Sequence, residues 1–258
     1  MTWRCLQRFH RTFLLGCRSG SCGRRLITLR CGDRTCSFCR VKDYYRLLEK
    51  YAPALREIHR PKLITLTLVN YPDLTRDGVS HLRQCMKALF ERLEGIIRGG
   101  LYAIEATNRG RGWHVHVHVL ADADFIPQGE LSRIWHEITG DSFIVDVRAV
   151  DSPGEALRYL LKYLTKDPFI QKGDQARGEV DVQDGNAEEW IRRTFNEALK
   201  GVRLIHSFGS LYAYRPTRRS RSCRTCGCSD WVLISILLAW PEDIFGSESP
   251  PPGEAPAS

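Results

Sequence analysis

Two hydrophobic periods alternate along the middle of the chain. Runs of β-branched and other apolar residues with a period of two predict strands over 62–70, 101–107, 113–120 and 143–150. Apolar residues at helical spacing predict helices over 41–58, 79–97 and 129–139. We expect Gly99-Gly100 and Gly140 to end the last two helices, and the sequence NRGRG after Thr107 predicts a hairpin.

From residue 62 onward the predicted order is strand, helix, strand, strand, helix, strand. This order predicts an α+β fold of the ferredoxin/RRM-like βαββαβ type, an antiparallel sheet with helices on one face. The other face of the sheet is expected to remain open for chemistry.

The remaining segments flank this core. A helix over 152–166 is expected to begin at Ser152, with Pro153 at its first position and Glu155 closing a capping box. A helix near 187–200, a strand near 203–214 and an apolar segment, 231–240, follow. The expected divisions are a basic Cys-rich segment with a helix (1–58), a main domain (59–170), a C-terminal extension (171–245) and a disordered tail rich in Pro, Glu and Ser (246–258).

Composition and charge narrow the function. A chain of 258 residues with 43% hydrophobic residues can bury a core, which excludes a disordered or fibrous protein. The net charge is +8; the first 60 residues, with 14 Lys and Arg against four Asp and Glu, have a net charge of +10, and the rest of the chain has −2. Such a basic end favours nucleic acid or an anionic surface, the alternative being a solvated basic face. With no apolar run of about 20 residues and no signal-peptide pattern, we expect a cytoplasmic protein without a membrane partner.

Ten cysteines in a reducing compartment favour metal over disulfides. Two CxxC pairs, Cys36 with Cys39 and Cys223 with Cys226, are typical of zinc sites. The candidate zinc ligands are Cys17, Cys22, Cys31, Cys36, Cys39, Cys223, Cys226 and Cys228. The early group, Cys17 to Cys39, and the late group, Cys223 to Cys228, together supply enough thiolates for two four-thiolate zinc sites. Alternatively, the late pair Cys223 and Cys226 can complete a site with cysteines of the early group. The remaining alternative is that these are scattered reduced thiols that bind no metal. Cys85 is expected in the core.

Arginines border both groups of cysteines and are expected to bind DNA phosphates. They are Arg24, Arg25, Arg30, Arg34 and Arg40 near the early group, and Arg215, Arg218, Arg219, Arg221 and Arg224 near the late one.

A candidate catalytic metal site lies in GWHVHVHVL. On a strand, His114, His116 and His118 project from one face and the intervening valines from the other. Antiparallel pairing about the hairpin brings Glu105 near His116, and a mixed set of carboxylate and imidazoles suits Mg²⁺ or Mn²⁺. The alternatives are a polar strand face with incidental histidines, and a Glu105 that faces solvent or pairs with Arg109 or Arg111.

A second constellation lies in YLLKYLTK. At helical spacing, Tyr159, Lys162, Tyr163 and Lys166 share one arc, and leucines lie opposite. A tyrosine can attack a phosphodiester and a lysine can stabilise the charge that develops, whereas tyrosines that merely border the core are the structural alternative.

Together these motifs resemble those of a known family. HVHVL at 116–120 resembles the His-hydrophobic-His signature of the HUH endonucleases, and YLLKYLTK at 159–166 is similar to the two-tyrosine form of their nucleophile motif. The most similar group is the rolling-circle replication initiators of small plasmids and single-stranded phages, in which a stretch like GWH often precedes the histidines. The resemblance covers residues 60–170, and more weakly CGDRTCSFC at 31–39.

This resemblance implies a DNA strand transferase. His116 and His118 would bind the catalytic divalent ion, Glu105 is our choice for the third ligand, and His114 would support the site or contact DNA. Tyr163 would attack first and Tyr159 second, each leaving a 5′-phosphotyrosine and a free 3′-OH. No ATP is required, and because the chain has no P-loop, a host helicase and a polymerase are implied partners beside single-stranded origin DNA.

Two other functions remain open. A two-tyrosine transposase would use the same chemistry, and a zinc-containing DNA-binding regulator would use the histidines and tyrosines only structurally.

Overall fold

The computed structural model describes residues 10–18, 23–31, 33–108, 112–163, 168, 185–203, 205–212, 214–215, 222–223 and 225–239. The chain forms two compact units. The terminal unit combines both ends of the chain, Met1–Lys42 with Thr217–Pro252, and the central unit contains Asp43–Pro216. These units differ from the contiguous segments 1–58 and 171–245 predicted from the sequence, because strand pairing joins the two ends.

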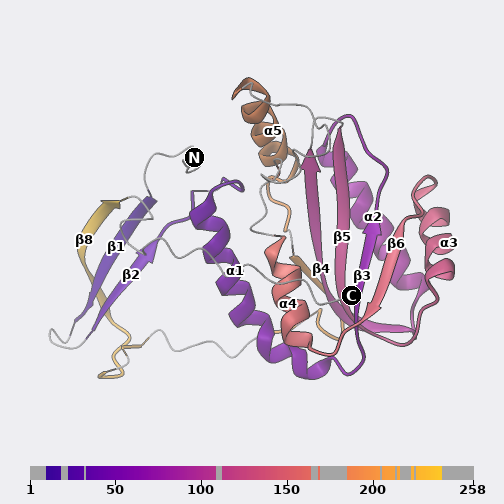
Figure 1. Ribbon diagram of the computed structural model, residues 1–258. Helices are drawn as coiled ribbons and strands as arrows, with labels where there is room; N and C mark the ends of the chain where they lie inside the picture. Colours follow the sequence, from indigo (N-terminus) through magenta and orange to yellow (C-terminus); the bar gives the residue numbers. More distant parts are fainter. Residues whose placement is uncertain are drawn as a thin grey trace. The chain divides into compact units, whose positions relative to one another are not determined.

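The terminal unit contains a three-stranded antiparallel sheet of order β2-β1-β8 (Figure 1). Its strands are β1 (His10–Cys17), β2 (Arg24–Thr28) and β8 (Trp231–Ala239). The sequence predicted a strand or buried segment at 231–240, but it did not predict β1 and β2, whose short apolar runs are interrupted by arginine and glycine.

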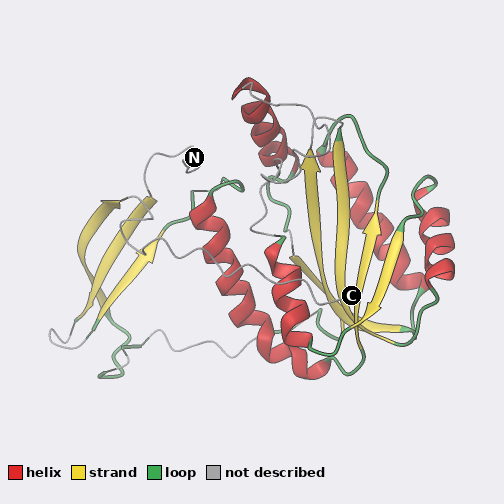
Figure 2. Ribbon diagram, in the orientation of Figure 1, coloured by secondary structure: helices red, strands yellow, loops and turns green. Residues whose placement is uncertain are grey.

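The central unit holds the helices and the larger sheet (Figure 2). Its strands are β3 (Pro61–Thr67), β4 (Ile97–Asn108), β5 (Trp113–Ala123), β6 (Val145–Ala149) and β7 (Ile205–Gly209). Its helices are the end of α1 (Ser37–Tyr51), the 3-10 helix η1 (Ala52–Glu57), α2 (Arg76–Arg92), α3 (Gln128–Thr139), α4 (Pro153–Lys162) and α5 (Gly185–Ala198). No described helix is long and apolar enough to cross a membrane.

The five strands of the larger sheet are ordered β6-β3-β5-β4-β7, and every neighbouring pair is antiparallel. The α+β class and the antiparallel sheet are therefore confirmed. The ferredoxin-like assignment stays a prediction. The strand β7, which the sequence predicted over 203–214 as part of a separate extension, is shorter and pairs with β4 in this sheet.

Several predicted helix ends were wrong for local reasons. The helix predicted over 79–97 is α2, which starts at Arg76 after the N-cap Thr75 and ends at Arg92. Gly99-Gly100 does not end this helix but lies inside β4, where a Cβ on Gly100 would come 2.1 Å from the carbonyl oxygen of Leu120. Only glycine permits that approach.

Other helix ends followed local signals. The helix predicted over 41–58 begins earlier, at Ser37, and changes to the 3-10 helix η1 at Ala52, where Pro53 cannot donate a helical hydrogen bond. Gly140 ends α3 in the left-handed conformation, with φ of +83°, as expected.

Both faces of the larger sheet are covered, although the sequence predicted one open face. One face packs against α2, α3 and α5, and Val115, Val117 and Val119 of β5 are buried there. On the other face, Leu101 and Leu120 pack with Leu157 and other apolar residues of α4, η1 and the end of α1. The leucine side of α4 thus covers one end of the face that carries the histidines.

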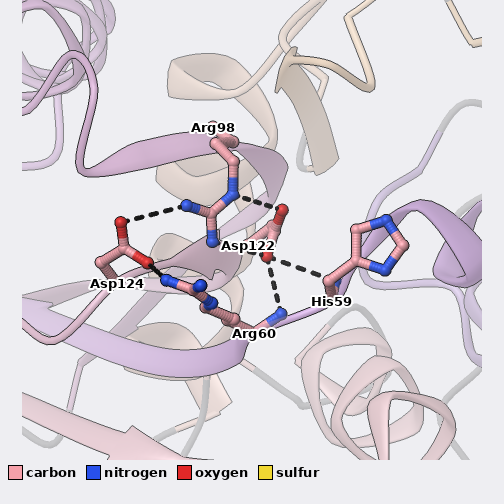
Figure 3. A network of polar contacts seen from close by, with 5 residues as sticks. All are labelled: His59, Arg60, Arg98, Asp122 and Asp124. Carbon is pink, nitrogen blue, oxygen red and sulfur yellow. Dashed lines mark hydrogen bonds and ion pairs between the residues drawn. The ribbon is translucent and has the colours of Figure 1, made fainter.

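A buried carboxylate ties the start of β3 to the hairpin β4–β5 (Figure 3). Asp122 accepts hydrogen bonds from the backbone N–H groups of His59 and Arg60 at 3.2 and 2.7 Å, and from the Arg98 guanidinium at 2.7 and 3.1 Å. Arg98 also pairs with the more exposed Asp124, at 3.2 Å. The Arg98 guanidinium and the backbone donors hold the pKa of Asp122 below its ordinary value.

Candidate active site

Strand β5 places the three histidines on one face, as predicted. Successive side chains alternate, so His114, His116 and His118 face away from the buried valines. His118 is buried, and the other two histidines are half-buried. Consecutive rings in this row have centroids 4.2 and 5.9 Å apart.

Glu105 lies directly opposite His116 in the β4–β5 register, which confirms the predicted pairing. Its carboxylate turns diagonally toward the next histidine, and Oε2 lies 2.9 Å from Nε2 of His118. Glu105 is 6% exposed and therefore does not face solvent. The alternative partners, Arg109 and Arg111, lie outside the described residues.

Two threonines of β3 orient the histidine rings. Thr65 and Thr67 stand opposite His118 and His116, and their hydroxyls contact the Nδ1 atoms at 3.2 and 3.0 Å. Sequence reasoning missed both threonines, although KLITLT places them at one strand parity. His114, at the end of the row, bonds through Nδ1 to the side chain of Asn70.

The donor set fits a divalent cation of the kind that oxygen and imidazole ligands hold. Since hydroxyls engage Nδ1 of His116 and His118, Nε2 is the nitrogen that each ring would offer to a metal. In the described part of the chain, the groups of three or more possible ligands whose atoms all lie within 4.8 Å are two cysteine clusters. Glu105, His116 and His118 are not among them, and the contact between Glu105 and His118 would have to yield to the ion.

Tyr163 lies against the last of the three histidines on β5, His118. It is the C-cap residue of α4, and its ring stacks on the imidazole of His118 with centroids 3.7 Å apart and planes inclined by 4°. Tyr159, one turn earlier, has its ring edge-on to Tyr163 at 5.3 Å and to His118 at 6.4 Å. The helix therefore brings both predicted nucleophiles to the predicted metal ligands.

The two phenols differ in their surroundings. Tyr163 is 8% exposed, and burial, Tyr159 and Glu105 together raise the pKa of its phenol. Lys162 lies closer to Tyr159, its Nζ being 3.9 Å from that ring centroid and 5.5 Å from the centroid of Tyr163. The helix predicted to reach Lys166 ends at Lys162, and Lys166 lies outside the described residues.

The cysteines of the terminal unit gather in two clusters that can hold a metal such as zinc. The β1 cluster consists of Cys17, Cys223 and Cys226, and the α1 cluster consists of Cys31, Cys36 and Cys39. Of the two arrangements left open by the sequence, the structure thus favours the one in which the late pair joins an early cysteine. Cys228 is half-buried near the β1 cluster, and Cys22 lies outside the described residues. Cys85 is buried in the central core, as predicted.

The predicted DNA-binding arginines are only partly described. Arg24, Arg25, Arg30 and Arg215 are exposed, whereas Arg34 and Arg40 are half-buried. Arg218, Arg219, Arg221 and Arg224 lie outside the described residues.

Comparisons with protein-family models, with curated proteins and with solved structures find no match.

Proposed function

We propose that this protein is a metal-dependent endonuclease of the HUH type, which nicks and rejoins single-stranded DNA at a rolling-circle replication origin. The observation that carries the proposal is the stacking of Tyr163 on His118, whose Nε2 contacts Glu105. A potential nucleophile, two imidazoles and a carboxylate thus lie on one sheet face, and such a set can support phosphodiester transfer.

In this proposal Glu105, His116 and His118 hold Mg²⁺ or Mn²⁺. The ion supplies Lewis-acid polarisation of the scissile phosphate. Thr65 and Thr67 fix the histidine rings, and Lys162 provides positive charge beside the phenols.

The phenolic oxygen of Tyr163 would attack phosphorus as its proton passes to solvent water, and the bond from phosphorus to the 3′ oxygen would break. The 3′ oxygen takes up a proton, which leaves a 3′-OH for a polymerase and a 5′-phosphotyrosine on the protein. Because the phosphotyrosine is a phosphodiester like the bond it replaces, the reverse attack rejoins DNA without ATP. Tyr159 would perform the second attack that ends a round of replication.

The terminal unit would bind zinc through its cysteines and origin DNA through its arginines, and a host helicase would separate the strands. We place this activity in the cytoplasm, where the cysteines stay reduced. A two-tyrosine transposase would perform the same cleavage on transposon ends.

One observation favours a second candidate, a zinc-containing DNA-binding regulator. The ring of Tyr163 is buried, as expected of a residue with a structural role. Incubation with Mn²⁺ and a supercoiled plasmid carrying the DNA that flanks the gene separates the two. The proposed enzyme converts the plasmid to a nicked form, and chelation of the metal stops the reaction. A protein that binds the plasmid but leaves it supercoiled is the regulator.

A further inference from the structure

The β1 cluster joins parts of the chain that are far apart in sequence. Cys17 ends β1, whereas Cys223 and Cys226 precede β8, and 209 positions separate Cys17 from Cys226. The strands β1 and β8 are antiparallel partners, with Cys17 opposite Trp231. The thiols therefore meet at one end of a strand pair that connects the two chain ends.

The sulfur spacing is that of metal ligands. Sγ of Cys17 lies 3.5 Å from Sγ of Cys226, and Sγ of Cys31 lies 3.6 Å from Sγ of Cys39. Two thiolates on a tetrahedral zinc ion, each about 2.3 Å from the metal, stand about 3.8 Å apart. A disulfide requires about 2.05 Å.

The backbone around the late pair is a tight turn. The N–H of Gly227 donates to the carbonyl of Cys223 at 2.9 Å, and the N–H of Cys223 donates to the carbonyl of Cys228 at 2.6 Å. Gly227 has a φ of +74°, which favours glycine. Gly23 approaches from the β1–β2 hairpin so closely that a Cβ there would come 2.9 Å from Sγ of Cys223. The turn at Cys223–Cys228 and the backbone at Gly23 thus both lie close to the thiol of Cys223.

Apart from the cysteine clusters, the described part of the terminal unit buries few hydrophobic side chains. Among its described residues, the buried hydrophobic side chains are Cys17, Cys36, Cys39 and Cys223, and both apolar core clusters of the chain lie in the central unit. Exposed apolar residues instead line its sheet, namely Leu26, Ile27, Val232, Leu233, Ile234 and Ile236. Small units with so little buried apolar surface are typically stabilised by disulfides, a bound metal or oligomerisation.

We propose that two thiolate zinc sites replace a hydrophobic core in the terminal unit, and that the site at Cys17, Cys223 and Cys226 fastens the C-terminal strand β8 to the N-terminal strand β1. The α1 cluster forms the second site. A tetrahedral site takes a fourth ligand, and Cys228, whose backbone carbonyl accepts from the N–H of Cys223, is the candidate among the described residues. The inference rests on the zinc part of the proposed function and needs no nuclease activity.

The proposal is tested by proteolytic cleavage of the chain between its two units. Residues 217–221 are replaced by the recognition sequence of a specific protease, the protein is purified reduced with zinc, and cleavage is taken to completion. We expect about two zinc ions per chain and a C-terminal fragment, 222–258, that co-elutes with the rest of the chain on gel filtration. After zinc is removed by a strong chelator under reducing conditions, the fragment should elute alone.

Matched cysteine variants assign the two sites. Cys223→Ser with Cys226→Ser should lower the zinc content by half and release the fragment without chelator. Cys36→Ser with Cys39→Ser should lower it equally but retain the fragment, and Cys85→Ser should change neither. A protein that binds no zinc, or a fragment that stays bound after zinc removal, overturns the inference. Because the readouts are zinc content and elution, failure of DNA nicking leaves this test unaffected.

Discussion

Nε2 of His118 lies 2.9 Å from the Glu105 carboxylate, while the ring of the same histidine is covered by Tyr163 at a centroid distance of 3.7 Å. One imidazole thus connects a possible metal ligand with a possible nucleophile. The pairing of β3, β4 and β5 positions His118 and Glu105, and α4 positions Tyr163.

The first prediction concerns the metal ligands. Replacing both His116 and His118 with Ala should abolish nicking of a single-stranded origin oligonucleotide, because no imidazole remains to hold the ion. DNA binding, measured by gel shift, should persist through the arginines of the terminal unit. His114→Ala should reduce nicking far less than the double variant, since this histidine bonds to Asn70 at the end of the row. Full nicking by the double variant would contradict the assignment of His116 and His118 as metal ligands.

The second prediction concerns the threonine behind a histidine. Thr67→Val keeps the shape of the side chain but removes the hydroxyl that contacts Nδ1 of His116. Loss of such a support typically weakens metal binding by about 10- to 100-fold. The Mn²⁺ concentration needed for half-maximal nicking should rise accordingly. Thr107→Val, opposite His114, is the control, and an unchanged Mn²⁺ requirement in Thr67→Val would contradict the assigned role.

The third prediction separates the two tyrosines. Tyr159→Phe should nick at nearly the normal rate but fail to release unit-length circles, because the second attack needs its own phenol. Tyr163→Phe should lose the first nick by about three orders of magnitude or more. The rings remain in place in both variants, so unfolding temperatures should change little. Equal loss of the first nick in both variants would show that the roles are not divided in this way.

The fourth prediction concerns stability and pH. Asp122 has a depressed pKa in the folded protein, so its contribution to stability is present above the unfolded-state pKa of about 3.9 and is lost as the pH falls through the folded-state pKa. Asp122→Asn should lower the free energy of unfolding at pH 7 by about 2–3 kcal/mol, because charged hydrogen bonds are lost. It should also flatten the acid dependence of stability below pH 4. Urea unfolding from pH 3 to 7 measures both effects.

The control for that prediction is Asp124→Asn, which removes the exposed partner of the same arginine. It should change stability much less than Asp122→Asn does. Equal destabilisation by the two variants would mean that burial and the two hydrogen bonds from Arg98 give the charge of Asp122 no greater contribution than that of the more exposed Asp124.

The parts of the site that follow a local period were predictable from the sequence. Strand parity places the histidines on one face, hairpin symmetry places Glu105 opposite His116, and helical spacing brings Tyr159 and Tyr163 to one side of α4. The sequence also marked the cap of that helix, since the Ser152 hydroxyl accepts from the N–H of Glu155 at 3.3 Å.

The missed features depend on pairing between distant segments. Nothing local indicates that β3 would stand beside β5 and bring Thr65 and Thr67 to the histidines. In the same way, the pairing of β1 with β8 decides which cysteines meet, and CxxC spacing alone left that open. The covering of one sheet face by α4 was likewise not predictable, because the leucines of α4 pack against Leu101 and Leu120, which are far away in sequence.

The most direct test of the central claim is to trap and map the covalent product. The protein is incubated with Mn²⁺ and a single-stranded oligonucleotide from the DNA beside its gene, the adduct is isolated, and its peptides are sequenced by mass spectrometry. We expect a 5′-phosphonucleotide on the hydroxyl of Tyr163, absent from Tyr163→Phe and from the protein without divalent metal. An adduct on Tyr159 in the unaltered protein would reverse the order of attack. Cleavage without any tyrosine adduct, or an adduct that persists when both tyrosines are Phe, would contradict the mechanism.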